Sequence, residues 1–147
     1  MTDDTVLVDL THHTLDVQSL SEAVRSDADG AVVTFVGVVR DRSDDDRTVD
    51  GLVYEAYAAM ALPEMRAICD EVRQRFPRAR IALAHRIGRL AVGEASVAIA
   101  VATPHRADAF AACTYAIDEL KRRVPIWKHE RYAGGDASWR ANAAEGA

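Results

Sequence analysis

The fold is decided by residues 103–131, TPHRADAFAACTYAIDELKRRVPIWKHER. Apolar residues recur in this stretch at spacings of 3, 4, 3 and 4, at Phe110, Cys113, Ile117, Leu120 and Val124. That spacing predicts a helix over about 105–123 with one face packed on a sheet. Because proline has no amide hydrogen, Pro125 should end the helix, and residues 126–132 should form a final strand.

Working outward, the patterns predict strands near 6–10, 30–40, 52–57, 81–85 and 95–102, and helices near 16–25 and 63–75. Residues 30–40, GAVVTFVGVVR, are rich in β-branched side chains and read as a buried strand. Pro63 is expected to open its helix, and 41–51 to be an exposed, mobile loop. The elements mix without strict alternation, which predicts an α+β fold with a mixed, largely antiparallel sheet and helices packed on it. Strand 53–57 is expected to pair antiparallel within 81–102.

Length and composition are those of a single domain spanning residues 1–147. The chain is 49% apolar and 28% charged, with a formal net charge of -5, which argues against a disordered chain and a general nucleic-acid binder. The N-terminus lacks a secretory signal pattern, and Cys69 and Cys113 read as buried, reduced thiols, so we expect a cytoplasmic protein. Residues 133–147 are expected to form a flexible tail.

Charge is distributed unevenly in this acidic chain. Residues 103–131 hold six Lys and Arg against four Asp and Glu, with two of the five histidines. Thr103 is expected to cap the long helix, and free amides there, beside His105 and Arg106, would form an anion pocket. The alternative is that both side chains are ordinary solvated residues of a first helical turn.

Two lysines flank the expected bend at Pro125. If the chain folds back there, Lys121 and Lys128 could face one site, and cationic neighbours would lower their pKa toward neutrality. A lysine of that kind can act as a general acid, a general base or an amine nucleophile. Arg40, at the end of the strand predicted over 30–40, could join this site, although alone it reads as a solvated residue.

The segments GAVVTFVGVVR, LVYEAYAAM, HRIGRLAVGEASVAIAVATPHRADAF and DELKRRVPIWKHE, in this order between residues 30 and 130, resemble the large, catalytic subunit of molybdopterin synthase. The resemblance implies an α/β-hammerhead-type α+β fold. It also implies a homodimer that binds one small ubiquitin-like sulfur-carrier subunit at each end, giving a heterotetramer. The carrier's C-terminal Gly-Gly thiocarboxylate would donate sulfur twice, converting cyclic pyranopterin monophosphate to the dithiolene of molybdopterin.

The same resemblance implies roles for individual residues. Lys121 and Lys128 would be catalytic. The substrate-binding residues would be Arg40, His105, Arg106, Val38, Val39, His129 and Glu130. Arg140, in the tail, could help to close the pocket. No metal or other cofactor is required of this chain.

Two other functions remain open from the residues alone. The basic segment could belong to a binding module that recognises a phosphorylated metabolite or a partner's C-terminal carboxylate without turnover. An RNA-binding α+β domain is a weaker alternative, because the chain lacks an aromatic-rich strand motif.

Overall fold

The computed structural model describes residues 6–135 and 137–141. The elements follow in the order β1 (Val6–Thr11), α1 (Val17–Val24), β2 (Ala31–Val38), β3 (Val49–Ala56), α2 (Ala58–Arg75), β4 (Arg80–Arg86), β5 (Gly88–Leu90), β6 (Ala95–Thr103), α3 (Arg106–Arg123), β7 (Ile126–Tyr132) and β8 (Ala137–Ala141). The predicted α+β class is confirmed. No helix in these residues is both long and apolar enough to cross a membrane.

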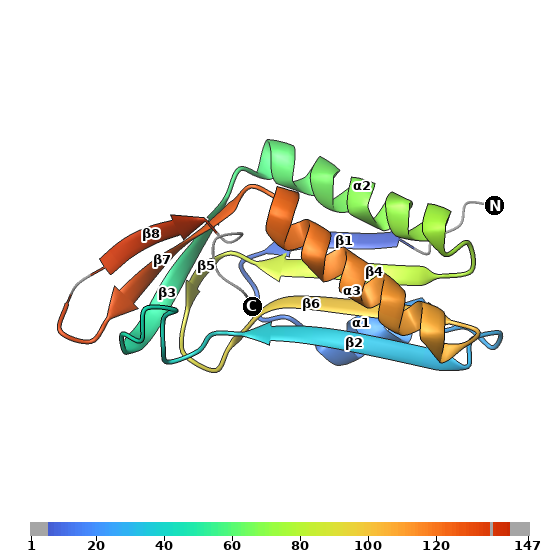
Figure 1. Ribbon diagram of the computed structural model, residues 1–147, viewed down its shortest axis with the longest axis horizontal. Coiled ribbons are helices and arrows are strands. Elements are labelled where there is room, and N and C mark those ends of the chain that lie inside the picture. The colour runs from blue at the N-terminus through green and yellow to red at the C-terminus, as the bar shows by residue number, and fades with distance from the viewer. Residues whose placement is uncertain (1–5, 136, 142–147) are drawn as a thin grey trace.

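In the part of the chain that the structure describes, the strands form two four-stranded sheets rather than one (Figure 1). The first sheet has the order β1-β4-β6-β2, and the second has the order β5-β3-β7-β8. Every adjacent pair is antiparallel except β1 and β4. The expected pairing of β3 within residues 81–102 is right only for the short strand β5, since β3 otherwise pairs with β7.

Helices α2 and α3 lie on one face of the first sheet, and α1 lies on the other (Figure 1). The main core is shared by both sheets and the two long helices. It includes Leu52 and Ile126 of the second sheet, Leu83 and Ile99 of the first, and the predicted apolar stripe of α2 at Met65, Ile68, Cys69 and Val72. A smaller cluster under α1 consists of Val24, Ala82, Ala100 and Ala102. Burial raises the pKa of the Cys69 thiol to about 12 and that of Cys113 to about 11.

Strand β2 is an edge strand, so the expectation of a buried strand over 30–40 is wrong. Exposed residues alternate with half-buried ones along it, apart from the buried Gly37, and Val32, Val36 and Val38 are among the exposed large apolar residues. An apolar, β-branched run predicts a strand, but it does not show whether the strand has neighbours on both sides.

Two helix starts differ from the prediction. Helix α2 begins at Ala58 and includes Pro63 as its sixth residue, where the proline has no amide hydrogen to donate to the carbonyl four residues earlier. Helix α3 has His105 as its N-cap, without a side-chain cap bond. Thr103 ends β6 instead, and its hydroxyl donates to the His105 carbonyl at 2.6 Å.

The C-terminal part of the chain also departs from the prediction. Residues 137–141 were expected to be loose, but they form β8, which pairs antiparallel with β7. Residues 136 and 142–147 of the expected tail lie outside the described residues.

A charged cluster ties the last turn of α3 to α2. The Arg123 guanidinium contacts Glu64 at 2.9 Å, Glu71 at 2.7 Å and Glu119 at 3.1 Å. The hydrogen bond from Arg123 lowers the pKa of Glu71, and its bonds to Glu71, Glu64 and Glu119 raise the pKa of Arg123 itself. The cluster therefore holds the end of α3, which carries Lys121, against its neighbour.

His85 is the most buried ionisable side chain of the first sheet. Its ring is fully buried on β4, Nδ1 donates to the Arg86 carbonyl at 2.8 Å, and Nε2 has no hydrogen-bond partner among the described residues. Burial is the largest cause that lowers the pKa of His85, from 6.5 to about 4, and the charge of Lys121 adds to it. His85 is therefore neutral in the folded protein near pH 7.

We expect this histidine to make folding stability dependent on pH. Because its pKa is lower in the folded chain, the unfolded chain takes up the proton first, and stability falls as pH drops from 6.5 towards 4. The total loss from this group is roughly 3 kcal/mol. Urea unfolding should show that the free energy of unfolding depends less on pH in His85→Asn than in the wild type. Exposed His13→Asn is the control, and equal slopes for all three proteins between pH 6.5 and about 5 would contradict the assignment.

Candidate active site

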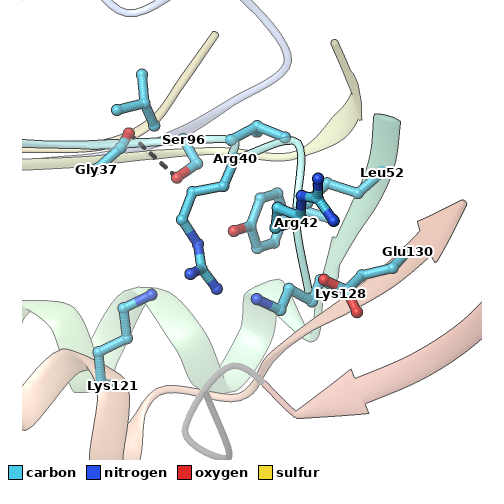
Figure 2. A pocket seen from close by; sticks show the side chains of 11 residues that line it. Gly37, Arg40, Arg42, Leu52, Ser96, Lys121, Lys128 and Glu130 are labelled. Carbon is cyan, nitrogen blue, oxygen red and sulfur yellow. Dashed lines mark hydrogen bonds between the residues drawn. The ribbon is translucent and has the colours of Figure 1, made fainter. Parts of the chain in front are cut away.

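A cavity of about 60 Å³ lies where the end of β2, the loop after it, β3, β7 and the last turn of α3 meet (Figure 2). Four basic side chains and one carboxylate line it. The lining residues are Gly37, Val38, Val39, Arg40, Arg42, Leu52, Tyr54, Ser96, Lys121, Lys128 and Glu130. The excess of positive charge makes an anion the preferred ligand.

Lys121 and Lys128 both line this cavity, as the bend at Pro125 predicted. Lys121 lies in the last turn of α3, the helix ends after Arg123, and Lys128 is the third residue of β7. The Pro125 carbonyl accepts a hydrogen bond from the Tyr57 amide at 3.2 Å, which anchors the bend to the start of α2. Figure 2 shows that the ends of Lys121, Lys128 and Arg40 point towards one space. Two amines from different elements therefore share one site.

The alternation of β7 decides which of its side chains reach the cavity. Ile126, Lys128, Glu130 and Tyr132 are buried on one face, whereas the residues between them are more exposed on the other. Glu130 is 3% exposed and accepts a hydrogen bond from the Tyr132 hydroxyl at 3.0 Å. His129 points to the opposite face, where it lines a separate hollow with Asp50 and Arg131. The structure therefore does not bring His129 into the site.

The end of β2 brings Val38, Val39 and Arg40 to the cavity. The register of β2 against β6 shifts between Gly37 and Val38, and the Val39 amide then donates to the Glu94 carbonyl at 3.0 Å. A side chain at Gly37 could not fit without movement, because its Cβ would lie 2.6 Å from Cγ1 of Val97. The guanidinium of Arg40 contacts Asp44 at 2.8 Å.

His105 and Arg106 are not part of this cavity in one chain. They lie at the N-terminal end of α3, and Lys121 lies 15 positions further along the helix. At 1.5 Å per residue, Arg106 and Lys121 are roughly 22 Å apart along the axis. Arg40, His105 and Arg106, which the resemblance implies bind the substrate, therefore do not share this cavity within a single chain. Arg140 lies on β8, and its side chain is outside the described part of the structure.

Several cavity residues were not predicted. Arg42 belongs to the polar loop, and its position two residues after Arg40 was the available signal. Tyr54 reads in the sequence as a core aromatic, yet it also lines the cavity, and its ring makes an edge contact with His85 at 4.9 Å between centroids. Leu52 and Ser96 come from different sheets, so no local pattern indicates their meeting.

The sequence matches the family described as MoaE protein over residues 10–123. Molybdopterin synthase catalytic subunit 1 of Aedes aegypti is 46% identical over 136 residues, covering 90% of this chain and 87% of the relative. The molybdopterin synthase catalytic subunit of Bos taurus is 44% identical, covering 92% of this chain and 71% of the relative. The crystal structure of molybdopterin synthase from Staphylococcus aureus has a TM-score of 0.84 at 36% identity, covering 89% of this chain and 94% of that one. The chain therefore belongs to the MoaE protein family.

Proposed function

We propose that this chain is the catalytic subunit of a molybdopterin synthase. It takes sulfur from the thiocarboxylated Gly-Gly terminus of a small ubiquitin-like carrier and transfers it to cyclic pyranopterin monophosphate. Two transfers give the dithiolene, and water returns each carrier terminus to a carboxylate. The observation that carries this proposal is the convergence of Lys121, Lys128 and Arg40 in one cationic cavity of a MoaE family member. Cys69 and Cys113 are buried and form no disulfide, which supports a cytoplasmic site of action.

The cavity suits the two anions of this reaction. Arg40 binds phosphate oxygens through charge-assisted hydrogen bonds. Lys121 acts at the carbon that receives sulfur or on the departing carboxylate, and Lys128 moves protons or binds the thiocarboxylate. Lys128 is 9% exposed, so its charge is poorly screened by water. Val38 and Val39 supply the wall of the cavity, and Glu130 balances part of its positive charge.

One chain offers only part of the space that the substrate needs. Small-molecule sites usually measure about 300–1,000 Å³, whereas this cavity measures about 60 Å³. It can accept a phosphate group or a narrow peptide terminus, while a fused-ring pterin must extend beyond it. A second chain at the cavity mouth would enlarge the site.

The edge formed by β2 and α3 supports a homodimer in which the second chain completes the site. Among the described residues, β2 is unpaired along one side. Val36 is 38% exposed and Phe110 on α3 is 59% exposed, although the helical spacing predicted that Phe110 packs on the sheet. A two-fold axis near the middle of this edge would cover these side chains, since such an interface uses the same patch twice. It would also bring His105 and Arg106 of the second chain to the Lys121 end of the first.

The role of Lys121 is tested by turnover. Lys121→Ala, mixed with thiocarboxylated carrier and the pterin precursor, should lose about 10²- to 10⁴-fold in rate, because a positioned proton-transfer group contributes about that much. Mass spectrometry of the product for two added sulfurs provides the measurement. Arg122→Ala is the matched control, since Arg122 is a neighbouring exposed cation paired with Glu119 outside the cavity. A normal rate for Lys121→Ala would remove its catalytic role, and binding without turnover by the wild type would favour a simple binding module.

The shared site is tested by mixing two inactive variants, Lys121→Ala and Arg106→Ala. In a mixed dimer, the Arg106→Ala chain keeps its own Lys121 and receives the intact Arg106 of its partner. Random pairing should therefore restore about a quarter of the wild-type sites. If both residues served the same chain's site, mixing would restore nothing. Light scattering should report a dimer in each preparation.

A further inference from the structure

Arg42 lies beside Arg40 at the cavity but has no role in the function proposed above. The two residues are separated by Asp41, which lies at a bend of the chain. The segment is held in place, because Arg42 forms a backbone bridge with Thr48 and the Val49 amide donates to the Asp41 carbonyl at 2.8 Å. Both arginines line the cavity that Lys121 and Lys128 share.

Each of these arginines has a carboxylate four residues further along the same loop. Arg40 contacts Asp44 at 2.8 Å, and Arg42 contacts Asp46 at 3.5 Å. The side chains are largely exposed, at 53% and 42% for the first pair and 57% and 89% for the second. Ion pairs in water are weak, so an incoming anion can replace these carboxylates at little cost.

The loop that carries the carboxylates, predicted from its sequence to be exposed and mobile, contains a hydrogen-bonded turn. Ser43 is 4% exposed, and its amide donates to the Arg47 carbonyl at 2.9 Å. The Asp46 amide donates to the Ser43 carbonyl at 2.9 Å, and Asp46 has a φ of 62°, in the left-handed region that aspartate tolerates better than most residues. The Arg47 guanidinium stacks on the Tyr132 ring at 3.9 Å. This backbone holds Asp44 and Asp46 near the arginines.

We propose that Arg42 is a second anion-binding residue of the cavity, and that Asp44 and Asp46 are internal counterions which leave Arg40 and Arg42 when an anionic ligand arrives. The ligand class is an oxyanion, either a phosphate ester or a carboxylate terminus. Within the proposed function, these are the pterin phosphate and the carrier's end. Asp44 and Asp46 thus neutralise the two arginines when no ligand is bound, and the anionic ligand takes their place on binding.

The test is a double-mutant cycle on Arg42 and Asp46, with inorganic phosphate as the probe. Binding to the full chain is measured by NMR titration at low ionic strength. Arg42→Gln should weaken phosphate binding by about twofold to fivefold, and Asp46→Asn should strengthen it by about the same factor. Asp70→Asn, an exposed carboxylate on α2 outside the cavity, is the control for net charge.

The double variant separates exchange from general repulsion. If Asp46 acts as the counterion of Arg42, then Asp46→Asn should have little effect once Arg42 is glutamine. The proposal would be overturned if Asp46→Asn strengthened phosphate binding equally with and without Arg42→Gln. It would also be overturned if Asp70→Asn strengthened binding as much as Asp46→Asn, or if Arg42→Gln left binding unchanged. Asn and Gln replace exposed side chains here, and circular dichroism confirms that each variant is folded.

Two further measurements identify the source of the anion. A change in KM for the pterin precursor in Arg42→Gln assigns the residue to the phosphate ester, whereas a change in the Kd of the carrier assigns it to the peptide terminus. Absence of a change in either would overturn a role in the reaction. The wild type could show no sulfur transfer while the double-mutant cycle of phosphate binding gives the expected result. In that case the proposed function fails and the counterion exchange stands.

Discussion

Pro125 is the constraint on which the candidate site depends. It cannot continue α3 as a hydrogen-bonded helical residue, so the chain leaves the helix after Arg123 and enters β7 at Ile126. The pairing of β7 with β3 then sets Lys128 opposite Tyr54, and the two-residue period turns Lys128 and Glu130 inward together. A longer connection between helix and strand would leave the relative position of the two amines undefined.

The charges of the site are organised at two levels of burial. Inside the cavity, Lys128 and Glu130 are nearly buried, so water screens their charges only weakly. At its mouth, Arg40 and Arg42 are exposed and paired with carboxylates of their own loop. Such an arrangement keeps four cations in one place without a bound ligand, because the outer two are neutralised locally. Arg123, by contrast, contacts two carboxylates of α2 and one of α3, and these contacts position the end of α3.

The unpaired edge of the first sheet connects the fold with assembly. An exposed edge strand with apolar side chains is unfavourable in water unless another surface covers it. In this molecule the edge strand β2 ends at the cavity, and the exposed Phe110 lies on the helix that leads to Lys121. Covering the edge and completing the site can therefore be achieved by one contact, which gives His105 and Arg106 a place in the proposed reaction.

Local sequence patterns alone determined the α+β class, the extents of α1, α3 and β7, and the bend that brings the two lysines together. These features follow from periodicity and from proline chemistry, which act over a few residues. Tertiary structure decided what depends on distant neighbours. Because of it, β2 lies at an edge, Phe110 is exposed and His129 points away from the cavity. It also separates His105 and Arg106 from Lys121, and it brings Arg42 and Tyr54 to the cavity. Burial and proximity arise from the pairing of remote strands, and a local pattern of apolar residues carries no information about which strand will be the neighbour.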